Sequence, residues 1–140
     1  GRSRTGMPDY LLVFRKDGDN PKPITHTRDA FPVEQWQQWA SPVWMDIRQT
    51  NTLNATSARE EKDERHLCPL QLDLIARALI LWSNPGDTVL SPFMGIGSEG
   101  VMSLKAERRF VGVELKGTYY RQAVQHLDAV DRQSSLLPKK

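Results

Sequence analysis

Residues 91–100, SPFMGIGSEG, decide how the rest of this 140-residue chain is interpreted. Glycines stand at positions 95, 97 and 100, in the G-x-G-x-x-G spacing of dinucleotide-binding loops. Glycine lets a backbone approach a ligand closely, because no side chain intervenes. However, Pro92 and Phe93 stand just before the first glycine, whereas in a nicotinamide-binding fold that glycine comes directly off its strand. The stretch therefore predicts a ligand-binding loop and leaves open which nucleoside it holds.

The segments on both sides of the loop predict an α/β fold. Residues 88–93, TVLSPF, have the composition of a short buried strand, and residues 109–115, RFVGVEL, that of a second strand. Ser98 is suited to cap a helix that runs to about Glu107. Strands that alternate with helices are typical of a parallel sheet. A last helix is predicted over residues 118–130, with an apolar face formed by Tyr120, Ala123, Val124 and Leu127.

A further helix is predicted directly before the loop. In residues 69–82, PLQLDLIARALILW, apolar side chains recur at helical spacing. Pro69 is suited to the first turn of a helix, and residues 84–87, NPGD, end it.

The N-terminal half of the chain is less regular. Residues 9–16, DYLLVFRK, predict a strand that ends in two cations. Residues 24–65 contain tryptophans at positions 36, 39 and 44, and then the polar run NTLNATSAREEKDER (51–65), which is typical of an exposed loop. The tryptophans either pack in a core or stack on nucleic-acid bases, and the sequence leaves both interpretations open.

The composition indicates one globular domain. The chain is 39% hydrophobic and 26% charged, with a net charge of +2, which permits nucleic-acid binding without arguing for it. No apolar stretch is long enough to span a membrane, and the N-terminus has no apolar core of a signal peptide. The single cysteine, Cys68, cannot form an internal disulfide, which agrees with a cytoplasmic location.

An acidic residue completes the pattern of the glycine loop. Glu114 lies at the end of the next predicted strand, nineteen positions after Gly95. A carboxylate at that place can accept hydrogen bonds from both hydroxyl groups of a ribose. The glycines and Glu114 together indicate a nucleoside ligand, although the same residues would also be compatible with a tight turn and a solvated strand end.

Four segments resemble the S-adenosylmethionine-dependent DNA amino-methyltransferases. SPFMGIG (91–97) resembles the D-P-F-x-G-x-G cofactor loop of that family. RHLCPLQLDLIARAL (65–79) is similar to the helix before this loop, and FVGVELKGTYYRQAV (110–124) to the acidic strand and the helix after it. PDYLLVFRK (8–16) resembles the strand before the target-recognition region. This order of segments resembles the permuted, beta-type subgroup, and phage-borne DNA methylases in particular.

The resemblance implies a fold and a division of the chain. The fold would be a partial Rossmann-like methyltransferase fold of the α/β class, with parallel strands, helices and one antiparallel strand. Residues 1–19 would hold the last strand of the catalytic half, residues 20–65 the target-recognition segment or loop, and residues 66–140 the S-adenosylmethionine-binding half.

The resemblance also implies an activity and its residues. The parent enzyme would transfer a methyl group from S-adenosylmethionine to an exocyclic amino group of adenine or cytosine in DNA. The residues expected to bind the cofactor are His66, Pro69, Ser91, Pro92, Phe93, Gly95, Gly97 and Glu114. Those expected to contact DNA are Arg15, Lys16, Trp44 and Arg48.

Two departures from the family pattern matter. Ser91 replaces the usual aspartate, and its hydroxyl group can still form a hydrogen bond. The catalytic Pro-Pro-aromatic motif is absent, so no catalytic residue is assigned, and the motif is expected upstream of residue 1. The segment SPVW (41–44) is similar to that motif, but Val43 replaces its second proline, which favours packing or DNA contact. The missing N-terminal half, or another chain, is expected to complete the sheet.

Two rival interpretations remain. The chain could be a non-catalytic remnant that binds DNA or a partner, or a nicotinamide-dependent dehydrogenase. A metal site is not expected, because His26 and His126 have no acidic or cysteine partners at metal-ligand spacing.

Overall fold

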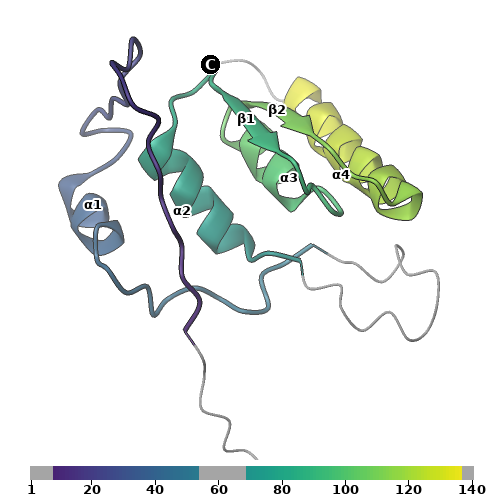
Figure 1. The fold of residues 1–140 in the computed structure, drawn as a ribbon, viewed down its shortest axis with the longest axis horizontal. Helices are drawn as coiled ribbons and strands as arrows, with labels where there is room; N and C mark the ends of the chain where they lie inside the picture. The colour runs from purple at the N-terminus through teal and green to yellow at the C-terminus, as the bar shows by residue number, and fades with distance from the viewer. Residues whose placement is uncertain (1–7, 54–68, 137–140) are drawn as a thin grey trace, which may run out of the picture.

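The computed structural model describes residues 8–53 and 69–136. In chain order its elements are α1 (Val33–Trp39), α2 (Leu72–Trp82), β1 (Thr88–Ser91), α3 (Ser98–Lys105), β2 (Arg109–Gly112) and α4 (Gly117–Leu136). Figure 1 shows α3 beside the two strands, with α2 and α4 on its two sides. Among the described residues, no helix has the length and apolar character needed to cross a membrane.

The two strands form a parallel sheet, as expected for an α/β fold. Thr88 is paired with Arg109 and Ser91 with Gly112, and α3 makes the crossover between the strands. Both strands are shorter than predicted. The chain turns at Pro92, directly after β1, and β2 already ends at Gly112. The segments beyond them stay hydrogen-bonded, since the Val113 amide donates to the Ser91 carbonyl at 2.9 Å.

The sheet is covered on one face only within the described residues. Val89 and Phe110 are half-buried on the side where α3 packs. Leu90, Val111 and Val113 point the other way and are 63%, 51% and 49% exposed. A parallel sheet normally has helices on both faces, so this apolar face is one that an additional layer would cover.

A glycine, and not Ser98, occupies the N-cap position of α3. Gly97 has φ = 89° in the left-handed region, and no side chain caps the helix. The prediction that Ser98 is the cap was therefore wrong: Ser98 is the first residue of the helix and is buried. A Cβ atom at Gly100 would come within 2.7 Å of Leu127 and Phe110, so the third glycine of the motif serves close packing.

The buried face of α4 is rotated from the predicted one. Ala123 is fully buried and Val130 is 7% exposed, but Tyr120 and Val124 are 51% and 37% exposed. The helix turns its small residue, Ala123, toward the glycine loop, because only a short side chain fits the close approach at Gly97. Periodicity identifies an apolar stripe but does not show which edge of the stripe faces the neighbour.

The N-terminal half differs most from expectation. Residues 9–16 do not form a strand in the described part of the chain, and Tyr10, Leu12 and Phe14 are 83%, 72% and 87% exposed. A strand needs a hydrogen-bonding neighbour, and the sheet seen here offers none to this segment. Helix α1 was not predicted, since it has only seven residues and begins after Pro32 without a side-chain cap. Most of the predicted loop over residues 51–65 lies outside the described residues.

Candidate functional site

The glycine loop joins β1 to α3 at the carboxyl end of the sheet. Gly95 and Gly97 have φ angles of 54° and 89°, both in the left-handed region that side chains disfavour. A Cβ atom at Gly95 would meet no other atom within 4 Å, whereas one at Gly97 would lie 3.1 Å from the Cβ atom of Ala123. Gly95 therefore borders open space, and Gly97 is required by the packing of α4.

The structure brings the acidic residue of the motif to the loop. The Gly95 amide donates a hydrogen bond to Glu114 Oε2 at 2.9 Å, and the Lys116 amide donates to Oε1 at 2.8 Å. Each carboxylate oxygen has two lone pairs, so each keeps one for a further donor. Glu114 is half-buried and lies just past the end of β2. The two residues that the sequence paired at a separation of nineteen positions are therefore in direct contact.

A histidine holds the opposite side of the loop. His126 Nδ1 lies 2.8 Å from the Ile96 carbonyl oxygen, and Nε2 lies 2.9 Å from the side-chain nitrogen of Gln122. This contact was missed in the sequence, where His126 was considered only as a metal ligand. The one signal for it was helical spacing, because His126 lies three residues after the buried Ala123.

Exposed apolar side chains stand at both ends of this site. Phe93, before the glycines, is 86% exposed, and Leu115, after Glu114, is 98% exposed. Leu115 was not singled out in the sequence, although its position next to the acidic residue was a usable signal. Each end of the glycine loop and acidic residue thus carries an exposed apolar group, and such groups suit a ligand with an apolar ring.

The remaining residues predicted to bind the cofactor differ in how exposed they are to solvent. Ser91 is buried at the end of β1, and Pro92 is exposed in the following turn. Pro69 is half-buried and precedes the first residue of α2 by three positions, so it is not in the first turn as expected. The prediction for His66 lies outside the described residues.

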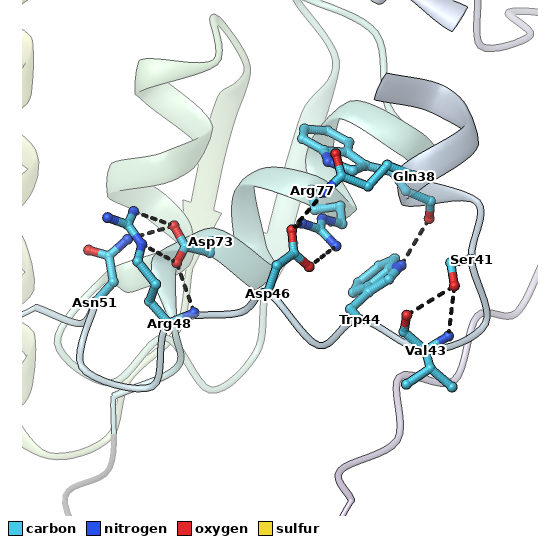
Figure 2. A network of polar contacts seen from close by, with 10 residues as sticks. Gln38, Ser41, Val43, Trp44, Asp46, Arg48, Asn51, Asp73 and Arg77 are labelled. Carbon is cyan, nitrogen blue, oxygen red and sulfur yellow. Dashed lines mark hydrogen bonds and ion pairs between the residues drawn. The ribbon is translucent and has the colours of Figure 1, made fainter. Parts of the chain in front are cut away.

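A buried arginine joins the predicted recognition segment to α2. The guanidinium of Arg77 is paired with Asp46 at 2.7 Å (Figure 2). It lies 5.0 Å from the ring centre of Trp39 and 4.7 Å from that of Trp44. Arg77 is only 5% exposed. The hydrogen bond from Arg77 lowers the pKa of Asp46 below its ordinary value. Two of the three tryptophans in the segment therefore form the walls of an arginine site.

A second ion pair lies one helical turn earlier on α2. Arg48 donates two side-chain hydrogen bonds to Asp73, at 2.7 and 2.9 Å, and Asn51 donates a third at 2.7 Å (Figure 2). These bonds, the one from Arg48 first among them, hold the pKa of Asp73 well below its ordinary value. Together with the Leu72 amide, which donates to the Asn51 carbonyl, they fix residues 46–51 to the start of α2.

The four predicted DNA-contacting residues fall into two groups. Trp44 donates through its indole nitrogen to the Trp39 carbonyl at 2.9 Å, and Arg48 is held by Asp73, so both have partners within the chain. Arg15 and Lys16 are exposed and form no ion pair with any described residue.

A second surface of the predicted recognition segment combines aromatic and cationic groups. Trp36 is 52% exposed, and Arg28 has no hydrogen-bonding or ionic partner among the described residues. They line a shallow pocket together with His26 and Phe31, whose rings meet edge to face at 4.8 Å. Neither Trp36 nor Arg28 was among the predicted DNA contacts.

The proline-containing segment that resembles the catalytic motif forms a local turn. The Ser41 hydroxyl group donates to the Val43 carbonyl at 3.0 Å and accepts from the Val43 amide at 3.4 Å (Figure 2). Within residues 8–53 and 69–136, no three His, Cys, Asp or Glu side chains are grouped to hold a metal ion.

Comparison with known proteins identifies the family. The family model described as DNA methylase, of the N6/N4 type, matches residues 2–125. The DNA adenine methyltransferase YhdJ of Escherichia coli (strain K12) is 27% identical over 133 residues, which are 95% of this chain and 39% of that protein. The type II methyltransferase M.BglI of Bacillus subtilis is 31% identical over 112 residues, covering 79% of this chain and 28% of the relative.

A solved structure has a similar fold over most of this chain. The protein TTHA0409 of Thermus thermophilus, in complex with S-adenosyl-L-methionine, matches with a TM-score of 0.61 and 27% identity. The match covers 83% of this chain and 41% of that protein. The present chain thus spans well under half the length of these relatives. Since the family model matches most of the chain, the chain belongs to the DNA methylase family.

Proposed function

We propose that this chain is the cofactor-binding and target-recognition part of a DNA methyltransferase that uses S-adenosyl-L-methionine. The observation that carries the proposal is the 2.9 Å hydrogen bond between the Gly95 amide and Glu114, which joins the glycine loop to the acidic strand end. Because the chain spans 28–41% of the relatives described above, the complete reaction belongs to the proposal.

The residues around this bond fit an adenosine group. Each oxygen of Glu114 accepts one backbone amide and keeps a lone pair, so the pair of oxygens can receive the two hydroxyls of a ribose. The exposed side chains of Phe93 and Leu115 offer apolar surface for a purine ring. The open space beside Gly95 lets a ligand approach the backbone.

The same loop fits a dinucleotide poorly. A pyrophosphate is held by free backbone amides in the glycine loop and at the helix start. Here the amides of both loop glycines are used internally: Gly95 donates to Glu114, and Gly97 donates to the Met94 carbonyl at 2.9 Å. S-adenosyl-L-methionine has no phosphate and does not need these donors, which favours it over NAD.

The other residues of the proposed cofactor site surround this centre. Gly97 shapes the turn, and Ser91 and Pro92 connect it to β1. Pro69 leads into α2, the helix that packs against α3. His66 is retained from the family resemblance. When bound, the cofactor would supply an activated methyl group, while these residues bind and orient it.

DNA is the proposed target, and the amino group of adenine or cytosine the proposed acceptor. Arg15 and Lys16 would neutralise phosphates, and this is supported by their exposure and by the fact that no described side chain pairs with them. Trp44 and Arg48 would contact DNA only by exchanging their present partners. The shallow pocket lined by Trp36 adds an exposed aromatic and cationic surface suited to a base and the backbone beside it.

The chain needs a second part for catalysis. It has no Pro-Pro-aromatic motif, and the segment 41–44 forms a turn whose serine is already hydrogen-bonded. The uncovered sheet face, with Leu90 and Val111, offers a surface for the part that brings the motif. In the cytoplasm, where DNA is available, the assembled enzyme would act as a restriction-modification methylase.

Calorimetric titration of the 140-residue chain tests the proposal. We expect binding of S-adenosyl-L-methionine and no binding of NAD under the same conditions. Tritiated cofactor should give no labelled DNA with this chain alone, because the acceptor-positioning motif is missing. Binding of DNA without any binding of the cofactor would instead support a non-catalytic remnant, and binding of NAD alone would support a dehydrogenase.

A further inference from the structure

The glycine loop is held by a side chain that is not among the residues proposed to contact the adenosine group. His126 in α4 lies 2.8 Å, through Nδ1, from the carbonyl oxygen of Ile96, the residue between the two left-handed glycines. We infer that His126 is a positioning residue of the cofactor loop. It keeps Gly95 and Gly97 in the conformation that binds the cofactor; this inference rests on the proposed function.

The partners of His126 define its tautomer. A carbonyl oxygen can only accept a hydrogen bond, so Nδ1 carries the proton and donates to Ile96. In the neutral ring Nε2 is then an acceptor, and the Gln122 amide group, 2.9 Å away, is placed to donate to it. Gln122 stands one helical turn before His126, so α4 itself orients the ring.

The contact is the polar part of a broader seam between α4 and the loop. Ile96 is 3% exposed, and its side chain packs against Tyr119. A Cβ atom at Gly97 would lie 3.1 Å from the Cβ atom of Ala123, which shows how closely the backbone approaches the helix. Tyr119, Ala123 and His126 follow one another at helical spacing of four and three residues, so they lie on one face of α4.

The hydrogen bond supplies what the apolar contacts cannot. Glycines allow a loop many backbone conformations, and apolar packing has no direction that would choose among them. A hydrogen bond from a ring fixed on a helix defines where the Ile96 carbonyl points, and so the orientation of the peptide groups on either side. Glu114 does the same for the Gly95 amide from the other side of the loop. The apparent affinity for the ligand is proportional to the fraction of molecules that keep this conformation.

Two substitutions of His126 separate positioning from packing. His126→Asn places a side-chain N–H where Nδ1 was and keeps the donor, whereas His126→Phe keeps a ring and removes the donor. Gln125→Asn is the matched control, because Gln125 is exposed on the same helix and has no partner among the described residues. For each chain, cofactor affinity is measured by calorimetry, amide exchange at Gly95 and Gly97 by NMR, and stability by the thermal midpoint.

We expect His126→Phe to bind S-adenosyl-L-methionine about three- to tenfold more weakly, the effect of one net hydrogen bond. The amides of Gly95 and Gly97 should exchange faster by a similar factor relative to those in α3. His126→Asn should recover most of both properties, and Gln125→Asn should match the unmodified chain.

The inference is wrong if His126→Phe leaves exchange at both glycines unchanged. It is also wrong if the Asn and Phe variants lose affinity equally, in step with their thermal midpoints, since His126 would then only stabilise the fold. If the unmodified chain does not bind the cofactor, the proposed function fails, and the exchange measurements still decide whether His126 holds the loop.

Discussion

The guanidinium of Arg77 donates to both carboxylate oxygens of Asp46, at 2.7 and 3.1 Å. These residues are 31 positions apart, and their contact connects α2 to the segment after α1. Because Arg77 is nearly buried between two indole rings, its charge has lost most of its water and depends on the carboxylate. The pair therefore does more than a surface ion pair to hold the segment around Asp46 against α2.

Removal of this carboxylate should destabilise the chain. Asp46→Ala leaves a buried guanidinium without its counter-charge, and we expect the free energy of unfolding to fall by about 1–3 kcal/mol. Urea denaturation measures the change. Asp128→Ala is the control, since its pair with Arg132 is 4.0 Å long and both side chains are more than half exposed. Equal stability of both variants would show that Arg77 does not need Asp46.

Glu114 should be required for the cofactor more than for the fold. Glu114→Ala removes the acceptor of the Gly95 and Lys116 amides and of the proposed ribose hydroxyls. We expect a loss of about 1.5–3 kcal/mol in the binding free energy of S-adenosyl-L-methionine, the range for hydrogen bonds to a charged group. Calorimetry measures it, with Glu34→Ala, at an exposed position of α1, as control. Unchanged affinity would remove Glu114 from the site.

The two loop glycines should respond differently to a methyl group. Gly95→Ala meets open space and carries only the left-handed strain of about 1–2 kcal/mol. Gly97→Ala adds the contact with Ala123 to the same strain, so we expect a total of about 2–5 kcal/mol. A larger side chain at position 97 should therefore disturb the fold as well as the approach of a ligand. If the two variants gave the same denaturation curve, the predicted difference in their stability would be contradicted.

Acid should weaken the attachment of residues 46–51 to α2. The pKa of Asp73 is below its ordinary value of 3.8, because Arg48 donates to its carboxylate. As the pH falls, Asp73 therefore binds a proton in the unfolded chain before it does so in the folded chain. The stability that the pair contributes is complete above about pH 4 and is lost as the pH falls through the pKa of Asp73 in the folded chain. Asp46 contributes in the same direction. Asp73→Asn should flatten the dependence of the urea midpoint on pH, and the exposed Asp9→Asn should not. Identical acid profiles would show that the pair with Arg48 has no effect on stability.

The uncovered face of the sheet should mediate association. Leu90 and Val111 are paired in register and are 63% and 51% exposed. We expect the 140-residue chain to self-associate at low micromolar concentration in sedimentation experiments, and the double variant Leu90→Thr, Val111→Thr to do so less. Val43→Thr, at a loop residue of similar exposure, is the control. Val89, which lies under α3, is not part of this surface. A sharply melting monomer would contradict the prediction.

The local pattern of the sequence was sufficient to predict the order of helices and strands in the C-terminal half. Apolar strand segments and helical periodicity act over a few residues, and they predicted α2 and the two parallel strands correctly. The glycines and Glu114 were expected to share a ligand, and the hydrogen bond that joins Gly95 to Glu114 was found only in the structure. The same pattern could not predict that residues 9–16 lack a partner, because strand formation depends on what lies beside a segment and not on its own composition.

Only the tertiary structure decided how the side chains are used. Trp44 and Arg48, interpreted as DNA contacts, have partners within the chain because α2 lies beside the segment that carries them. The helical spacing of His126 did not show what the side chain contacts, and only the packing of α4 brought it to the carbonyl of Ile96, thirty residues away along the chain. The sequence by itself determined which backbone segments of the C-terminal half fold into helices and strands, since propensity and periodicity are local. Which polar groups meet was decided by packing, since those contacts join residues that only the folded chain brings within 3 Å.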